Sequence, residues 1–149
     1  MIILRTWRGI ADHFPARVTE WLMIWPAFGM GLALTGQPEM FQTSPSFAVL
    51  ASWADERTWA TLVLTCAAAR AVALVVNGTF DAFRHSPILR GISALVAIVF
   101  WSQFCLGLLM AAVYAGGSWS GPVIYSTAVL AEIINVFRSW SDVGRTRPR

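Results

Sequence analysis

Three polar side chains that could take part in chemistry lie within stretches of the chain that are otherwise apolar: Arg70, Gln103 and Glu132. If these stretches form membrane helices that rise about 1.5 Å per residue, all three side chains lie roughly 15–20 Å from the outer ends of their helices. An unpaired charge at that depth is costly, so an arginine and a glutamate at one level are expected to meet. The sequence therefore predicts a buried Arg70–Glu132 ion pair that is braced by Gln103.

The helical faces around these residues indicate that they point into a bundle. Arg70 shares its face with Cys66 and Ala67, and Glu132 shares its face with Asn135. Small and polar faces of membrane helices usually contact other helices. The predicted intramembrane polar layer therefore consists of Arg70, Gln103, Glu132 and Asn135.

This polar layer has three possible roles. The ion pair could fix the register of the helices and do nothing else, which is a common role of polar residues in membrane proteins. Glu132 could instead titrate, or Arg70 could move, to open a route for ions or protons. In the third possibility the pair forms only between subunits.

The composition indicates which elements hold these residues. Of the 149 residues, 56% are hydrophobic and 13% are charged, with a mean hydropathy of +0.59, whereas about a quarter of the residues in a soluble domain are charged. A span of bilayer takes about 20 helical residues, and stretches of that length occur at 18–36, 58–77, 88–115 and 122–140. We therefore expect an all-α integral membrane four-helix bundle that forms a single membrane domain over 1–149.

Arginine placement predicts the orientation of this bundle. Cytoplasmic flanks of membrane helices carry an excess of Lys and Arg, and in a chain that crosses four times only Arg57 falls on the outer side. We therefore expect both termini in the cytoplasm, with the bacterial inner membrane as the location. The arginines expected on the inner side are Arg5, Arg8, Arg17, Arg84, Arg90, Arg138, Arg145, Arg147 and Arg149.

The segments outside the four spans also carry patterns. Over 2–14, apolar residues such as Trp7 and Ile10 recur at helical spacing and arginines fall elsewhere on the helix, which predicts an amphipathic helix at the membrane interface. Ser44-Pro45 predicts the start of a short helix in the loop after the first span. The chain ends in a basic tail over 141–149.

Small residues at helical spacing predict where helices approach each other closely. In the first span, Ala27 with Gly31 and Gly29 with Ala33 form small-xxx-small pairs. In the third span, the residues expected to share the packing face of Gln103 are Gly107 and Ala111.

The sequence offers no support for an enzyme or a cofactor protein. His13 and His85 are the only histidines and have no second ligand at metal spacing, and Cys66 and Cys105 lie within apolar stretches. The chain lacks a basic surface pattern typical of nucleic-acid binding. We expect a non-enzymatic protein without catalytic, cofactor or metal residues, whose partners are the lipid bilayer and either other copies of itself or a larger membrane complex.

The layout resembles that of small multi-pass membrane proteins of tailed phages, including holin-like lysis proteins. The resemblance lies in the short amphipathic start, the brief outer hairpin at 116–121 and the arginine-rich tail. It implies lateral oligomerisation into a membrane lesion, with small-residue faces such as Ala27 and Gly31 as contacts and the basic tail acting electrostatically.

Two further functions are compatible with the same features. A small carrier or channel would use the Arg70, Gln103 and Glu132 layer as its polar path. An accessory or assembly subunit would instead pack against a larger membrane complex.

Overall fold

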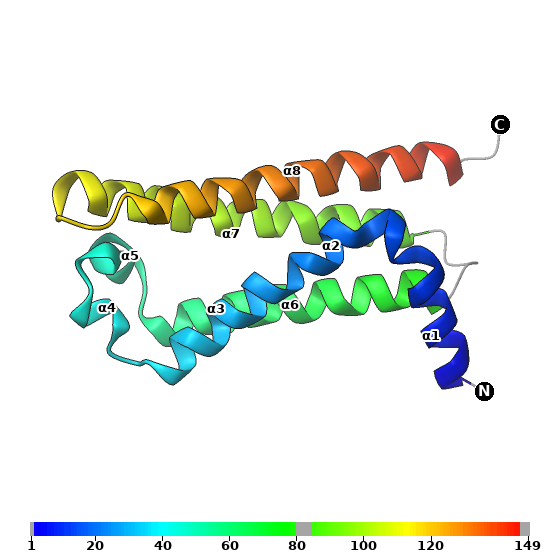
Figure 1. Cartoon of the computed structure of the whole chain (residues 1–149), viewed down its shortest axis with the longest axis horizontal. Helices are drawn as coiled ribbons and strands as arrows, with labels where there is room; N and C mark the ends of the chain where they lie inside the picture. The colour runs from blue at the N-terminus through cyan, green and yellow to red at the C-terminus, as the bar shows by residue number, and fades with distance from the viewer. Residues whose placement is uncertain (1, 80–84, 147–149) are drawn as a thin grey trace.

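The computed structural model describes residues 2–79 and 85–146, and within these ranges the chain forms helices and no strands. Long helices lie side by side in an elongated bundle (Figure 1). Arg84, Arg147 and Arg149, which the orientation prediction uses, lie outside the described residues. The predicted all-α class is therefore confirmed for the described part of the chain.

Three helices in the described part of the chain are long and apolar enough to cross a membrane. They are α6 (Glu56–Thr79), α7 (Ser86–Tyr114) and α8 (Ser120–Thr146). They contain the predicted spans 58–77 and 122–140 in full and nearly all of 88–115. α7 begins at Ser86 with a proline in its first turn, where the missing N–H of proline leaves no hydrogen bond unmade.

These helices carry large apolar side chains on their outward faces. Val72 on α6, Val99 on α7 and Phe137 on α8 are each more than half exposed. Exposed apolar area of this extent disfavours water as the surrounding solvent and suits lipid. The chain therefore has the surface expected of a membrane protein.

The predicted span at 18–36 is not one continuous helix. It divides into α2 (Val18–Leu22) and α3 (Ile24–Gly36), with Met23 between them. Pro26 has no N–H to donate to the carbonyl of Leu22, and its ring crowds that carbonyl, so the helix breaks one turn before the proline. Because of this break, three helices of the described residues are long and apolar enough to span a membrane, and the fourth crossing stays a prediction.

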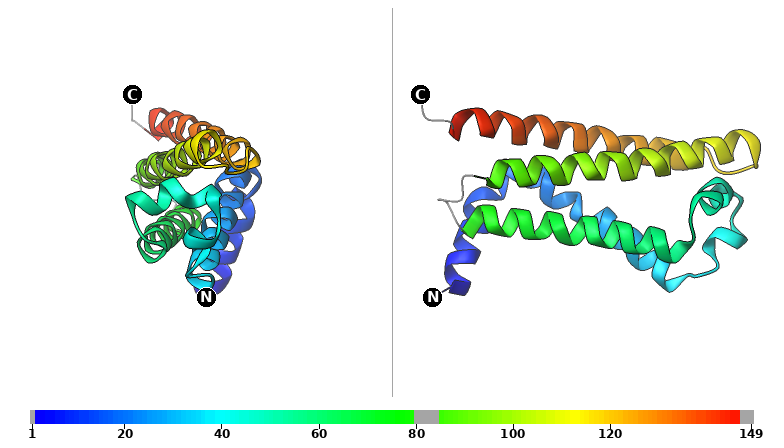
Figure 2. Two further views of the ribbon diagram at one scale, coloured as in Figure 1. Left: turned by 90° about the vertical axis from the view of Figure 1, so that its left-hand side faces the viewer. Right: turned by 180° about the vertical axis from the view of Figure 1, so that it is seen from behind.

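Both ends of the described chain lie at the same end of the bundle, which is called the terminal end below. α1 (Ile2–His13) and the 3-10 helix η1 (Pro15–Arg17) precede α2, and α1 runs across the bundle instead of along it (Figure 2). Leu4, Trp7 and Phe14 are exposed on this segment. The helix predicted at 2–14 is present, and its contact with a membrane surface stays a prediction.

The other end of the bundle, here the loop end, is covered by short helices. After α3 come α4 (Met40–Thr43), the 3-10 helix η2 (Pro45–Phe47) and α5 (Ala48–Trp53), so a helix does begin at Ser44-Pro45 as predicted. Leu50 of α5 is fully buried. α6 then begins where the Asp55 carboxylate accepts a hydrogen bond from the Thr58 N–H at 2.8 Å, which is a helix N-cap.

An aromatic cluster fills the bundle toward the loop end. The ring of Trp59 on α6 lies 5.1 Å from that of Phe104 on α7, edge to face, and Phe104 lies 5.6 Å from Tyr125 on α8. Phe100 and Trp101 extend the cluster along α7, with ring centroids 4.9 Å apart. Edge-to-face and tilted ring pairs stabilise the contact beyond simple burial. The three long helices are therefore packed tightly together in this half.

The predicted packing residues divide into two groups. Ala27 and Gly31 are buried, and a Cβ added at Gly31 would lie 2.5 Å from Leu64 Cδ2 on α6. Gly29 instead has nothing within 4 Å of an added Cβ, and its predicted partner Ala33 is only half-buried. α3 therefore packs on α6 through Ala27 and Gly31 and not through the second pair.

Gly107 and Ala111 pack as predicted, but against the loop end. A Cβ at Gly107 would lie 2.7 Å from Leu50 Cγ, and the carbonyl of the buried Ala111 accepts the Gly117 N–H at 2.9 Å. These two residues therefore hold α7 against α5 and against the connection to α8.

Candidate functional site

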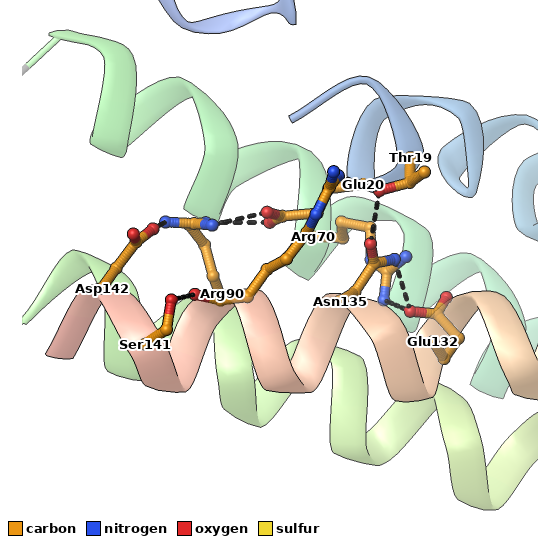
Figure 3. A network of polar contacts seen from close by, with 9 residues as sticks. Thr19, Glu20, Arg70, Arg90, Glu132, Asn135, Ser141 and Asp142 are labelled. Atoms are coloured by element: carbon orange, nitrogen blue, oxygen red, sulfur yellow. Dashed lines mark hydrogen bonds and ion pairs between the residues drawn. The ribbon is translucent and has the colours of Figure 1, made fainter. Parts of the chain in front are cut away.

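Arg70 and Glu132 meet inside the bundle. Arg70 Nη2 on α6 lies 2.5 Å from Glu132 Oε2 on α8, and their side chains are 7% and 1% exposed (Figure 3). The predicted ion pair is present within one chain. It therefore does not need a second subunit to form.

Asn135 and Thr19 connect this pair to α2. Asn135 Nδ2 donates to Glu132 Oε2 at 3.1 Å, while its Oδ1 accepts from the Thr19 hydroxyl at 2.7 Å. Arg138 Nη1 donates in turn to the Thr19 hydroxyl oxygen at 3.2 Å. Asn135 therefore belongs to the polar layer, as its place on the helix predicted.

Gln103 does not join this layer. It is exposed on α7 beside the exposed Val99 and Leu106, and the amide that contacts Glu132 is that of Asn135. The prediction placed Gln103 in the layer by its depth and assumed that it shares a face with Gly107 and Ala111. At about 100° per residue, these two lie roughly 40° and 80° around the helix from Gln103. They can therefore be buried while Gln103 faces outward.

A second buried ion cluster lies nearer the terminal end. Arg90 on α7 binds Glu20 on α2 with two hydrogen bonds, Nε to Oε2 at 2.8 Å and Nη2 to Oε1 at 2.5 Å. Its third donor, Nη1, lies 3.0 Å from Asp142 Oδ2 on α8. A guanidinium presents its donors in a planar fork that suits this two-sided arrangement, whereas an ammonium group does not.

Sequence reasoning missed this second cluster because Arg90 was assigned only to the orientation of the chain. A signal for it is present on α8, where Glu132, Asn135, Ser139 and Asp142 recur at spacings of three and four and so share one face. The first three of these are fully buried. A buried polar face of that length indicates charged or polar partners on the helices that pack against it.

The two clusters meet at α2, where Thr19 of one cluster is followed by Glu20 of the other, and together they are named here the α2–α8 network. It comprises Thr19, Glu20, Arg70, Arg90, Glu132, Asn135, Arg138 and Asp142. The network contains three arginines and three carboxylates. It fills the terminal half of the bundle, while the aromatic cluster fills the other half.

Arg17 lies close to this network. Burial, followed by the nearby Arg90 guanidinium, lowers the pKa of Arg17 from its ordinary value. The carboxylates of Glu20 and Asp142 act on that pKa in the opposite direction. At this position, burial and the neighbouring guanidinium therefore outweigh the carboxylates.

Two polar atoms of the central pair have no partner. Arg70 Nη1 and Glu132 Oε1 are buried and make no hydrogen bond. Beside them is a small cavity of about 10 Å³, lined also by Met23, Cys66 and Trp101. That volume is about the minimum that one water molecule occupies. The cavity can therefore hold one water molecule, but it has no room for a larger ligand.

The described residues contain no group of three or more His, Cys, Asp or Glu side chains that could hold a metal ion. Comparison with family models, with curated proteins and with solved structures found no match.

Proposed function

We propose that this chain is a small non-enzymatic protein of the bacterial inner membrane that acts by lateral association in the bilayer, in the manner of holins. In this proposal the chain crosses the membrane four times, with the terminal end in the cytoplasm. The surface that acts is the lipid-facing exterior of the bundle.

The observation that carries this proposal is the way the interior is occupied. In the terminal half, the charged side chains of the α2–α8 network form ion pairs with one another. In the other half, the space between helices is filled by aromatic rings such as Phe100 and Phe104, whose centroids are 4.8 Å apart. A bundle filled in this way supports action through its outer surface more than transport through its centre.

The four crossings are supported by the location of the chain ends. α1 and the last turns of α8 lie at the same end of the bundle (Figures 1 and 2), which an even number of crossings requires. α3 packs along α6, so the broken segment 18–36 lies beside a span. Arg17, Arg90 and Arg138 all belong to this end, in agreement with a cytoplasmic location.

The lateral contacts differ from those that the holin resemblance implied. Ala27 and Gly31 are buried against α6 within one chain, so they are not available to a second copy. Association must instead use helix faces that remain exposed.

Controlled expression in bacterial cells tests this proposal. Induction should collapse the membrane potential, arrest growth abruptly and release a co-expressed muralytic enzyme. The Arg70→Ala variant, which is expected to fold poorly, provides a matched control. An unimpaired membrane potential at high levels of inserted wild-type protein would contradict the proposal.

A small carrier of protons is the second candidate, and the free Glu132 oxygen beside the cavity favours it. Its test is Glu132→Gln, which should abolish proton flux in reconstituted vesicles when equal amounts of folded variant and wild-type protein are compared. Equal flux in the two proteins would exclude this role for Glu132.

A further inference from the structure

Gln103 belongs to the predicted polar layer but is exposed on the outer surface of the bundle. It lies in α7, 11 residues before the end of the helix at Tyr114, which is about 17 Å of helix. That depth is within the hydrocarbon of a bilayer about 30 Å thick. Its carboxamide is exposed there and, among the described residues, makes no hydrogen bond.

Three exposed threonines in these helices are satisfied by their own backbone. The hydroxyls of Thr61, Thr65 and Thr127 donate to the carbonyl four residues earlier, at 2.8, 2.7 and 3.0 Å. A glutamine side chain in lipid has no water to bind and needs a polar partner. Gln103 therefore differs from these threonines and requires a polar group from outside the chain.

The residues around Gln103 form a continuous line on α7, named here the α7 seam. Its members follow one another at spacings of three and four residues, and each of them is exposed. They are Val96, Val99, Gln103, Leu106, Met110 and Val113. This is the seven-residue repeat by which two helices pack in a left-handed crossing, with one polar residue in its middle.

We propose that the α7 seam is a contact between two copies of this chain, which pack in parallel about a twofold axis along the membrane normal and join through their Gln103 carboxamides. A carboxamide has both a donor and an acceptor, so the group that matches it best is a second carboxamide. Copies inserted in one orientation place their α7 helices parallel, which brings both Gln103 side chains to the same depth. A twofold axis then pairs each seam with itself.

This contact rests on the proposed lateral association, for which it names the interface. A single polar residue within such a repeat fixes register and partner number. A hydrogen bond between glutamines also adds attraction in a solvent where apolar contact alone gives little.

Cysteine cross-linking in native membranes tests the seam. In a background with Cys66→Ala and Cys105→Ala, Val99→Cys and Leu106→Cys should each form disulfide-linked dimers on mild oxidation. Ile134→Cys, which is equally exposed on the lipid face of α8, is the matched control and should remain monomeric. Equal cross-linking at all three positions, or at none, would overturn the proposal.

The role of Gln103 is tested by energy transfer between labelled copies as they are diluted into lipid vesicles. Gln103→Leu should lower the dimer association constant about threefold to thirtyfold, whereas Gln103→Asn should retain most of it. Both variants should fold, because position 103 faces lipid. An unchanged association constant in Gln103→Leu means that the carboxamide does not join the copies.

The seam and the proposed function can fail separately. Dimers joined through the seam without any change in membrane permeability would refute the holin-like role and leave the seam standing. Permeabilisation by assemblies that do not cross-link at positions 99 and 106 would refute the seam alone.

Discussion

At the residue scale, the central pair illustrates why buried charges specify a bundle. Arg70 and Glu132 come from α6 and α8, so their contact fixes the rotation of two helices at once. Asn135 and Thr19 extend that constraint to α2. Since the charges are buried together, removing one of them leaves the other without compensation in a medium that solvates it poorly.

We expect Arg70→Ala to reduce stability by about 3–5 kcal/mol, because Glu132 then remains buried and unpaired. The amount of folded protein extracted from membranes and its thermal midpoint measure this loss. The double variant Arg70→Glu with Glu132→Arg should recover much of it, because the pair is restored with its charges exchanged. If the single variant is as stable as the wild type, the pair does not hold the bundle together.

The sequence was informative about some of these residues and not about others. Arg70 and Glu132 could be paired because two opposite charges in apolar helices have few other partners. Gln103 could not be placed, because an uncharged amide can face either lipid or protein and because its small neighbours lie to one side of it. The ion pairs of Arg90 were not predicted, because an arginine near a helix end is also explained by the excess of arginine on cytoplasmic flanks.

At the element scale, the break between α2 and α3 and the glycines that follow it decide how the first segment packs. The break lies at Met23 because Pro26 has no N–H for the carbonyl one turn earlier and leaves that carbonyl without a donor. Beyond the break, Gly31 allows α3 to approach Leu64 of α6 closely.

Gly29 and Gly31 offer a matched pair of substitutions on one helix. Gly31→Ala should destabilise the protein by about 1–3 kcal/mol, because the new methyl group collides with Leu64 and α3 must move away. Gly29→Ala should be neutral or stabilise it by up to about 1 kcal/mol, because open space surrounds that position and alanine favours a helix. Thermal unfolding in detergent compares the two. Equal effects would mean that α3 does not pack on α6 through Gly31.

The start of α6 should depend on pH. Hydrogen bonds from the Thr58 hydroxyl and then from the Thr58 backbone N–H lower the pKa of Asp55 below its ordinary value of 3.8. A carboxylate with a lowered folded-state pKa stabilises the fold above its ordinary pKa, and this contribution disappears as pH falls through the folded-state pKa. The first turn of α6 should therefore lose stability below about pH 4.

Hydrogen exchange at the first turn of α6 between pH 7 and pH 3 measures this effect. Asp55→Asn is the control, because asparagine also caps helices but does not titrate in this range. The wild type should become less protected than the variant only at the acid end. Parallel behaviour of the two proteins would show that the Asp55 cap contributes nothing.

At the scale of the whole molecule, polar and aromatic interiors occupy opposite halves of one bundle. Buried ion pairs lie toward the terminal end, and packed rings lie toward the loop end. The hydrophobic stretches predicted the three long helices, because the length and apolar composition of a span are visible in sequence. The division of the interior was not visible, because it depends on which faces of separate helices meet.

The central claim is that the chain crosses the bilayer four times with both ends in the cytoplasm, and cysteine accessibility in a Cys66→Ala, Cys105→Ala background tests it most directly. A membrane-impermeant maleimide should label Ser52→Cys and Ser118→Cys in intact cells, because both positions are exposed at the loop end. Ala11→Cys and Ser141→Cys, both exposed at the terminal end, should be labelled only after the membrane is opened. Labelling of Ala11→Cys in intact cells while Ser141→Cys stays protected would contradict the claim, because the segment 18–36 would then not cross the membrane.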